Sequence, residues 1–107
     1  FKEDIDAAIE DLNKAIELSP QDVPSYLLRS QAYSSKEPPQ LDEAAKDVEE
    51  ALTRQPGNIM GLQLRATIAS MQDRFEEAIA DIQLLVRNDP DNVFFLRQLA
   101  QLYQADE

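Results

Sequence analysis

Apolar residues recur along this chain at spacings of three and four, which places them on one face of a helix. Three stretches share an alanine that is followed, four residues later, by a larger apolar residue. These pairs are Ala8 with Leu12, Ala44 with Val48, and Ala78 with Ile82. No stretch sustains the apolar–polar alternation of a half-buried strand. The pattern therefore predicts an all-α chain.

Prolines and capping residues mark where these helices end and the next ones begin. A proline follows each alanine by twelve residues, and a helix cannot continue through it. Two residues further on stands a side chain suited to cap a new helix. The prolines are Pro20, Pro56 and Pro90, and the caps are Asp22, Asn58 and Asn92. These signals predict six helices, at about residues 3–18, 22–35, 41–54, 59–71, 75–88 and 93–104.

The segments after the prolines also match one another. Each has a large residue, then a small residue four positions later, then a further packing residue three beyond that. The matched sets are Tyr26-Ser30-Tyr33, Leu62-Ala66-Ala69 and Leu96-Ala100-Tyr103. The prolines lie 36 and 34 residues apart, and over nearly its whole length the chain resembles the tetratricopeptide repeat (TPR), whose period is 34 residues. The resemblance implies a TPR-type superhelix, an α-solenoid of about six antiparallel helices.

The resemblance also divides the chain, as one array over residues 1–107. Residues 1–20 would hold the second helix of a repeat, 21–56 and 57–90 two full repeats, and 91–107 the first helix of a further repeat. Two extra residues in the first full repeat belong to the turn around Pro38-Pro39, because consecutive prolines cannot lie inside a helix. The chain begins at Phe1 rather than Met, so we expect a fragment of a longer TPR-containing protein, cut within its array at both ends.

Such a cut would leave the last helix without its following partner. Leu96, Leu99 and Tyr103 should then expose apolar surface, since each helix of a solenoid is buried by its neighbours. Exposed patches of this kind tend to find partners, and another copy of the chain, end to end, could cover this one.

The charge of the chain narrows the class of partner. Ten basic and 21 acidic residues give a formal net charge of −11. A surface this acidic repels nucleic acid and anionic lipid headgroups, and it favours a neutral or basic protein or peptide. The longest apolar run, Val93-Phe94-Phe95-Leu96, is too short to cross a membrane. The absence of cysteine fits the cytoplasm and the periplasm equally, so the sequence assigns no compartment.

Little in the sequence points to catalysis. There is no histidine, the commonest general base, and without histidine or cysteine there is no zinc-type ligand set. Neighbouring carboxylates such as Glu76-Glu77 do not face each other on a helix. Only two glycines are present, too few for a phosphate-binding loop. We expect no catalytic residue, no metal and no cofactor, and hence not an enzyme.

Two arginines stand where the family usually has leucine, at Arg29 and Arg65. Aspartates recur at one position of the second helices, as Asp11, Asp47 and Asp81. Arginine and aspartate so placed recur together in the family. Each arginine is therefore expected to pair with the aspartate of its own or the preceding repeat, because a guanidinium can meet a carboxylate with two hydrogen bonds.

The family resemblance also implies a binding surface. In tetratricopeptide repeats the first helix of each repeat lines a concave groove, mainly through its second, fifth and ninth residues. Carried onto this chain, the groove residues are Leu27, Gln31, Met60, Gln63, Thr67, Met71, Phe94, Arg97 and Gln101. The predicted function is a protein-interaction module or scaffold that binds a peptide or helical segment in this groove. The alternative is a structural spacer or self-association segment of a larger repeat protein.

One subset of the family grips a C-terminal carboxylate with Lys, Asn and Arg of the groove. Here Leu28 stands where an asparagine of that clamp would be, and Arg97 is the only basic residue among the groove positions. We therefore do not expect that specificity.

Overall fold

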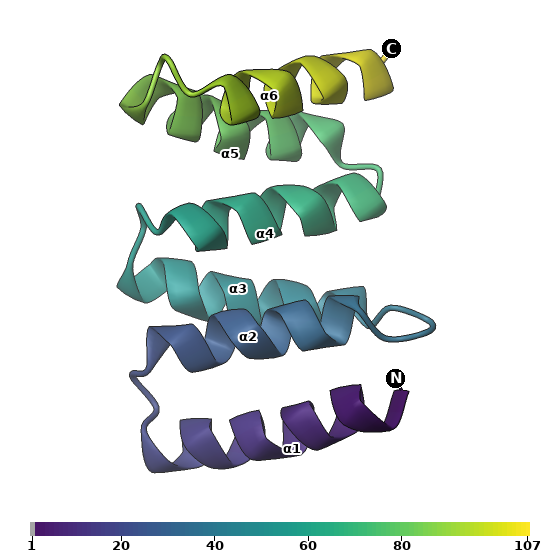
Figure 1. Cartoon of the computed structure of the whole chain (residues 1–107), viewed down its shortest axis with the longest axis vertical. Helices are drawn as coiled ribbons and strands as arrows, with labels where there is room; N and C mark the ends of the chain where they lie inside the picture. The colour runs from purple at the N-terminus through teal and green to yellow at the C-terminus, as the bar shows by residue number, and fades with distance from the viewer. Residues whose placement is uncertain (1) are drawn as a thin grey trace.

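The structure, a computed structural model, describes residues 2–107 and consists of six helices joined by short connections (Figure 1). The all-α prediction is confirmed, and each predicted helix end lies within one residue of the observed one. The helices are α1 (Lys2–Leu18), α2 (Val23–Ser34), α3 (Leu41–Arg54), α4 (Ile59–Met71), α5 (Phe75–Asn88) and α6 (Val93–Ala105).

The three predicted caps begin α2, α4 and α6. The side chains of Asp22, Asn58 and Asn92 each accept the backbone N–H of the residue three positions on. These bonds are 3.2, 2.8 and 3.1 Å long and satisfy a donor that the start of a helix leaves free. Helices α3 and α5 begin without a side-chain cap. They carry two acidic residues in the first turn instead, which favours the positive end of the helix dipole.

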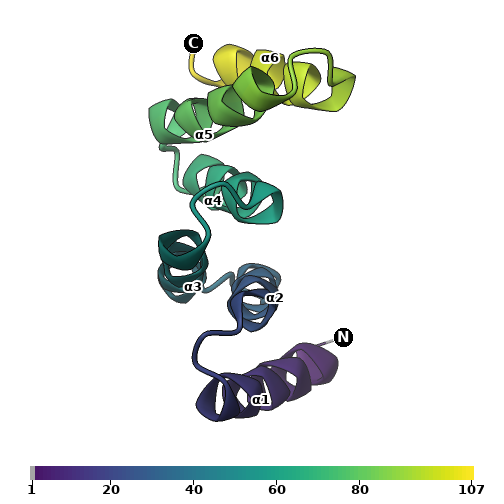
Figure 2. The ribbon, with the colours of Figure 1, turned by 90° about the vertical axis from the view of Figure 1, so that its left-hand side faces the viewer.

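The helices stack along the longest axis of the molecule, so that the two termini lie at opposite ends of it (Figure 1). The extents are 38 × 28 × 19 Å. Packing is tightest between α2 and α3 and between α4 and α5. Helix α2 also contacts α4 directly. Figure 2 shows α2 beside α3, with α4 above them and the α5–α6 pair stacked at the far end.

The core lies where these pairs meet. Ala44 and Val48 of α3 are fully buried, as are Ala78 and Ile82 of α5. The alanines allow close approach: the Ser30 hydroxyl of α2 donates a 2.7 Å bond to the Ala44 carbonyl of α3. The alanine-led apolar faces that predict the helices are therefore the surfaces on which α3 and α5 pack.

The two end helices are less covered. Among residues 3–18 of α1 none is fully buried, and Ala8 is exposed although its counterparts Ala44 and Ala78 have no exposed surface. In α6 only Phe95 is buried, with 7% of its surface exposed. Leu96 and Tyr103 are 42% and 48% exposed, while Leu99 packs partly against the core.

The turn around Pro38-Pro39 is the longer of the two within-pair connections. It spans residues 35–40, whereas the turn between α4 and α5 spans residues 72–74. The prolines lie outside both flanking helices, as predicted. The shorter turn places Asp73 at a φ of 60°, in the left-handed region that aspartate tolerates better than most residues.

Candidate functional site

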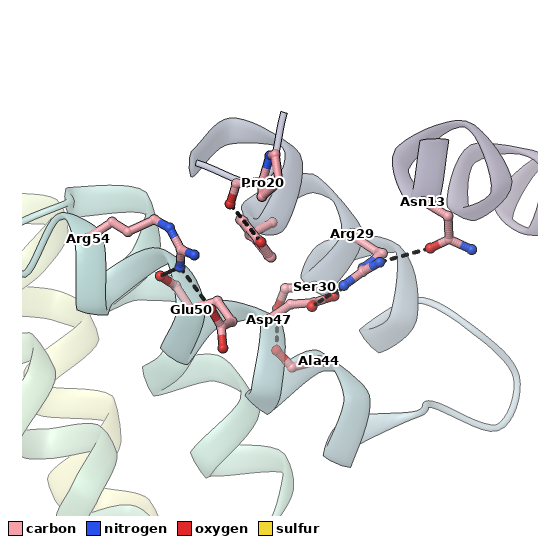
Figure 3. A network of polar contacts seen from close by, with 9 residues as sticks. Asn13, Pro20, Arg29, Ser30, Ala44, Asp47, Glu50 and Arg54 are labelled. Atoms are coloured by element: carbon pink, nitrogen blue, oxygen red, sulfur yellow. Dashed lines mark hydrogen bonds and ion pairs between the residues drawn. The ribbon is translucent and has the colours of Figure 1, made fainter. Parts of the chain in front are cut away.

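Arg29 joins three helices. Its Nε and Nη2 atoms, on α2, donate 2.7 Å bonds to the two carboxylate oxygens of Asp47 on α3. Its third nitrogen, Nη1, donates a 2.9 Å bond to Asn13 Oδ1 on α1 (Figure 3). The guanidinium also lies 6.0 Å from the ring centroids of Tyr26 and Tyr33. All of its donor groups are thus turned toward neighbouring helices.

Arg65 repeats this arrangement one repeat later. Its Nε and Nη2 atoms donate bonds of 2.9 and 2.8 Å to the carboxylate of Asp81 on α5. Its Nη1 donates a 3.0 Å bond to Glu49 Oε1 on α3. Asn13 and Glu49 occupy the same position in successive second helices, 36 residues apart. Each arginine therefore ties a first helix both to its own second helix and to the preceding one.

These contacts favour the charged form of both arginines. The hydrogen bond with Asp47 raises the pKa of the Arg29 guanidinium, against the lowering effect of partial burial. Asp81, and then Glu49, raise the pKa of Arg65 in the same way, again against burial. Both guanidinium groups stay protonated and hydrogen-bonded, which leaves them little capacity to hold a ligand.

Asp11 does not take part in an ion pair among the described residues, and its expected structural pairing is wrong for this chain. The observed pairs join an arginine to an aspartate 18 or 16 residues further on. Arg29, which could have turned to it, contacts Asn13 of the same helix instead. Asp11 is consequently exposed.

The residues predicted to line a groove lie on α2, α4 and α6, and most of them are exposed. Met60, Met71 and Phe94 are the large apolar ones, at 37%, 46% and 51% exposure. The exposed polar ones are Gln31, Thr67, Arg97 and Gln101, while Gln63 is half-buried.

Leu27 is the exception, and its assignment to an exposed groove is wrong. It is 4% exposed and belongs to the main apolar core. Its counterparts one and two repeats later are Gln63 and Arg97. This repeat position is therefore apolar in α2, where the side chain is buried, and polar in α4 and α6, where it is half-buried or exposed.

A small hollow of about 90 Å³ lies between α4 and α6. Thr67 and Gln101, two of the predicted groove residues, stand on opposite sides of it. The other side chains around it come from the same two helices, with Ile82 of α5 also lining it. They are Ala66, Ser70, Gln98 and Leu102. The hollow offers two hydroxyls, two amides and a few methyl groups.

Charge is unevenly distributed between helices α2, α4 and α6 on the one hand and α1, α3 and α5 on the other. Helices α2, α4 and α6 contain no acidic residue, and each carries one arginine. Two of these arginines are engaged by Asp47 and Asp81, so Arg97 carries the unneutralised charge of the three. The acidic residues lie on α1, α3, α5 and the connections. The face built by α2, α4 and α6 is therefore close to neutral in a strongly acidic protein.

Among the residues that the structure describes, no group of three or more carboxylates is placed to share a metal ion. No helix within that part of the chain is both long and apolar enough to cross a membrane.

Sequence reasoning missed several residues of these arrangements. Asn13 and Glu49 share a repeat position, and this correspondence could have identified them as partners of the arginines. They were missed because their side chains differ and neither belongs to the apolar pattern. Gln98 and Leu102 line the hollow although they lie outside the family's usual groove positions. Which way α6 is rotated depends on its packing against α5, and this information is not in the sequence of α6 alone.

A family model and relatives of known sequence match parts of this chain. A family model described as tetratricopeptide repeat matches residues 1–22. Sperm-associated antigen 1 of Rattus norvegicus is 37% identical over 59 residues, which is 55% of this chain and 7% of that protein. Its Mus musculus namesake is 34% identical over 59 residues, 55% of this chain and 6% of that protein. The chain thus spans a small part of the length of these relatives.

Solved structures share the fold along almost the whole chain. The first TPR of Spaghetti (RPAP3), bound to the HSP90 peptide SRMEEVD, matches with a TM-score of 0.85 at 20% identity. That match covers 97% of this chain and 81% of the other. The Arabidopsis OM64 TPR domain matches with a TM-score of 0.82 at 22% identity, over 95% of this chain and 83% of that one.

Proposed function

Because the chain has the fold of a tetratricopeptide-repeat array, we propose that it is a protein-interaction module that holds a segment of a partner protein against α2, α4 and α6. One observation carries the proposal: these helices form a nearly neutral face with exposed apolar side chains, on a molecule whose net charge is −11. Stacked helices of this kind form extended surfaces suited to a peptide or a helix.

The residues on this face can make both kinds of contact that a peptide needs. Met60 and Phe94 stand at matching positions of α4 and α6, and both are available to anchor apolar side chains. Thr67 and Gln101 border the hollow between the same helices and can hydrogen-bond a peptide backbone. Helices α4 and α6 thus carry both apolar anchors and polar groups.

The preferred segment is neutral or basic. The peptide held by the Spaghetti domain, SRMEEVD, contains three acidic residues and one arginine. On the face proposed here, Arg97 is the only basic side chain among the described residues that lacks a carboxylate partner. A peptide as acidic as SRMEEVD would meet one such cation and the repulsion of the whole chain.

The alternative function is that of a spacer or self-association segment in a larger repeat protein. The contacts of Arg29 and Arg65 with preceding helices support a role in joining repeats. A spacer would not need Met60 or Phe94, so these residues separate the two functions.

The test is a selection of peptides from a random display library on the 107-residue chain, followed by affinity measurement with individual synthetic peptides. The double substitution Met60→Glu/Phe94→Glu should weaken the selected peptides at least about tenfold, because it places charge at both apolar anchors. The selected sequences should be neutral or basic.

Leu18→Glu/Leu84→Glu is the matched control. These leucines are also exposed but lie on α1 and α5, away from the proposed face. Both double variants should keep the helical circular dichroism of the parent. Equal affinity of the selected peptides for the parent and for Met60→Glu/Phe94→Glu would contradict the proposal and favour a site on α1, α3 or α5, a site at the Pro38-Pro39 turn, or the spacer role.

A further inference from the structure

The interface between α4 and α6 carries polar side chains at positions that are apolar in the equivalent interface between α2 and α4. Leu64 of α4, which packs against the core, corresponds to Gln98 of α6. Leu27 of α2, only 4% exposed, corresponds to Gln63 of α4. Helices α2 and α4 also pack together more closely than α4 and α6 do. The two leucines of one interface are thus glutamines at the other, where Gln98 lines the hollow of about 90 Å³.

The groups around the hollow keep hydrogen-bonding capacity that the protein does not use. Gln63 Nε2 donates a long 3.5 Å bond to Gln98 Oε1, a bond that uses the oxygen of Gln98 and not its NH2 group. The Thr67 hydroxyl donates to the Gln63 carbonyl at 3.0 Å and can still accept a bond. In the described part of the chain, neither the Ser70 hydroxyl nor the Gln101 amide bonds to another protein group. The hollow therefore presents both donors and acceptors.

The chemistry of the lining selects a neutral polar occupant. The side chains that line the hollow, all within residues 66–102, carry no charge. A carboxylate or an ammonium group would give up water there without meeting an opposite charge, which is costly. An aliphatic side chain would cover the glutamine amides without bonding to them, and unmade hydrogen bonds are also costly. A primary carboxamide has both an NH2 donor and a C=O acceptor, so it can pair with both kinds of group.

The size of the hollow agrees with a carboxamide. A cavity of about 150 Å³ binds benzene. The hollow, at about 90 Å³, holds a smaller group, and a carboxamide is of that size. Of the two side chains that end in this group, asparagine is favoured, because the longer glutamine loses more rotamer freedom when it is held in place.

We propose that the hollow is a specificity pocket, which takes the side-chain carboxamide of an asparagine in the partner segment. This inference rests on the peptide-binding function proposed above. Met60 and Phe94 lie seven residues before Thr67 and Gln101 on the same two helices, which is about 10 Å along the helix axis. An extended segment covers that distance in about three residues. The preferred segment therefore has an apolar residue and an asparagine about three positions apart.

The hollow can be tested without any peptide, with N-acetylasparagine amide as the probe. Added to the isotope-labelled 107-residue chain, it should shift the NMR signals of Gln98 and Gln101 in a saturable way. N-acetylleucine amide and N-acetylaspartate amide should leave these signals unchanged at the same concentration. Gln98→Leu, which gives α6 the residue of α4, should abolish the response of Gln101. Gln104→Leu is the matched control and should keep it, because Gln104 is exposed on the same helix and does not line the hollow.

The second arm uses the peptides selected on the parent chain. These peptides should contain an asparagine, and its replacement by leucine or aspartate should weaken binding at least about tenfold. Against the Gln98→Leu chain, the peptide with leucine should bind at least as well as the peptide with asparagine. Helical circular dichroism checks that both substituted chains stay folded.

Equal NMR responses to the three amides would overturn the proposal, and so would the absence of any response, which would mean that the hollow holds water only. Selected peptides that depend on Met60 and Phe94 but tolerate leucine in place of asparagine would also overturn it, and would leave the peptide-binding function standing. A response to N-acetylasparagine amide, without any peptide that binds, would contradict the peptide-binding function while confirming the selectivity of the hollow.

Discussion

Replacing Arg29 by methionine should destabilise the protein more than removing the whole ion pair of which it is part. Asp47, its partner, has a side chain only 4% exposed and receives two 2.7 Å hydrogen bonds from the guanidinium. Methionine keeps most of the apolar stem but supplies no donor. The carboxylate would then remain buried without a charged partner, which is the costly outcome for a buried pair.

The magnitude follows from the burial of the two partners. Breaking a fully buried pair by removing one partner is destabilising by about 3–5 kcal/mol. The Arg29 side chain is 20% exposed, so solvent screens the pair in part and the lower end applies, about 3 kcal/mol. Asp47→Leu should have a smaller effect, about 2 kcal/mol, because the partly exposed guanidinium keeps its bond to Asn13. The double substitution Arg29→Met/Asp47→Leu should be more stable than Arg29→Met alone by at least about 1 kcal/mol.

Urea unfolding, followed by circular dichroism at the helical band, gives the four free energies of this cycle. Arg97→Met is the control, because Arg97 is exposed and such a change usually alters stability by no more than about 0.5 kcal/mol. The reasoning would be refuted if the double variant lost as much free energy of unfolding as the two single variants lose together. Additivity would mean that Arg29 and Asp47 do not depend on each other.

Two further predictions concern the cap of α4 and the end of the array. Asn58→Ala removes the side-chain acceptor for the Gly61 N–H and should lower the free energy of unfolding by about 1 kcal/mol. The same urea titration measures this change. Asn88→Ala, at the exposed end of α5, is the control and should have no effect. Leu99→Arg gives α6 the arginine that α2 and α4 carry, so it should promote end-to-end association through Asp11 of a second copy. Sedimentation velocity should show this association, and the added substitution Asp11→Leu should abolish it. A strictly monomeric Leu99→Arg chain would contradict the expected pairing of the introduced arginine with Asp11.

The helices of this chain could be predicted because their signals are local. Asp22, Asn58 and Asn92 mark helix starts through a bond to a residue only three positions away. The prolines at 20, 56 and 90 stop helices through their own ring geometry. Neither signal depends on tertiary packing, and repetition at one spacing makes each copy support the others.

The candidate site was less predictable because exposure depends on neighbours. Leu27, Gln63 and Arg97 occupy one repeat position, yet Leu27 is in the core and Arg97 is exposed. Asp11 has the sequence context of Asp47 but none of its burial, because no arginine-bearing helix covers it here. The repeat pattern fixes which positions correspond, whereas the presence of the neighbouring helix fixes what each position does.

Net charge and site charge act at different distances in this protein. The acidic residues behind the net charge of −11 lie on α1, α3, α5 and the connections, and beyond about 8 Å their charge is screened at physiological salt. Under the function proposed above, it would act only on segments that have come within that distance, and it would favour neutral or basic ones. Helices α2, α4 and α6 contain no acidic residue, so the contact proposed on their face would depend on apolar anchors and amide hydrogen bonds instead.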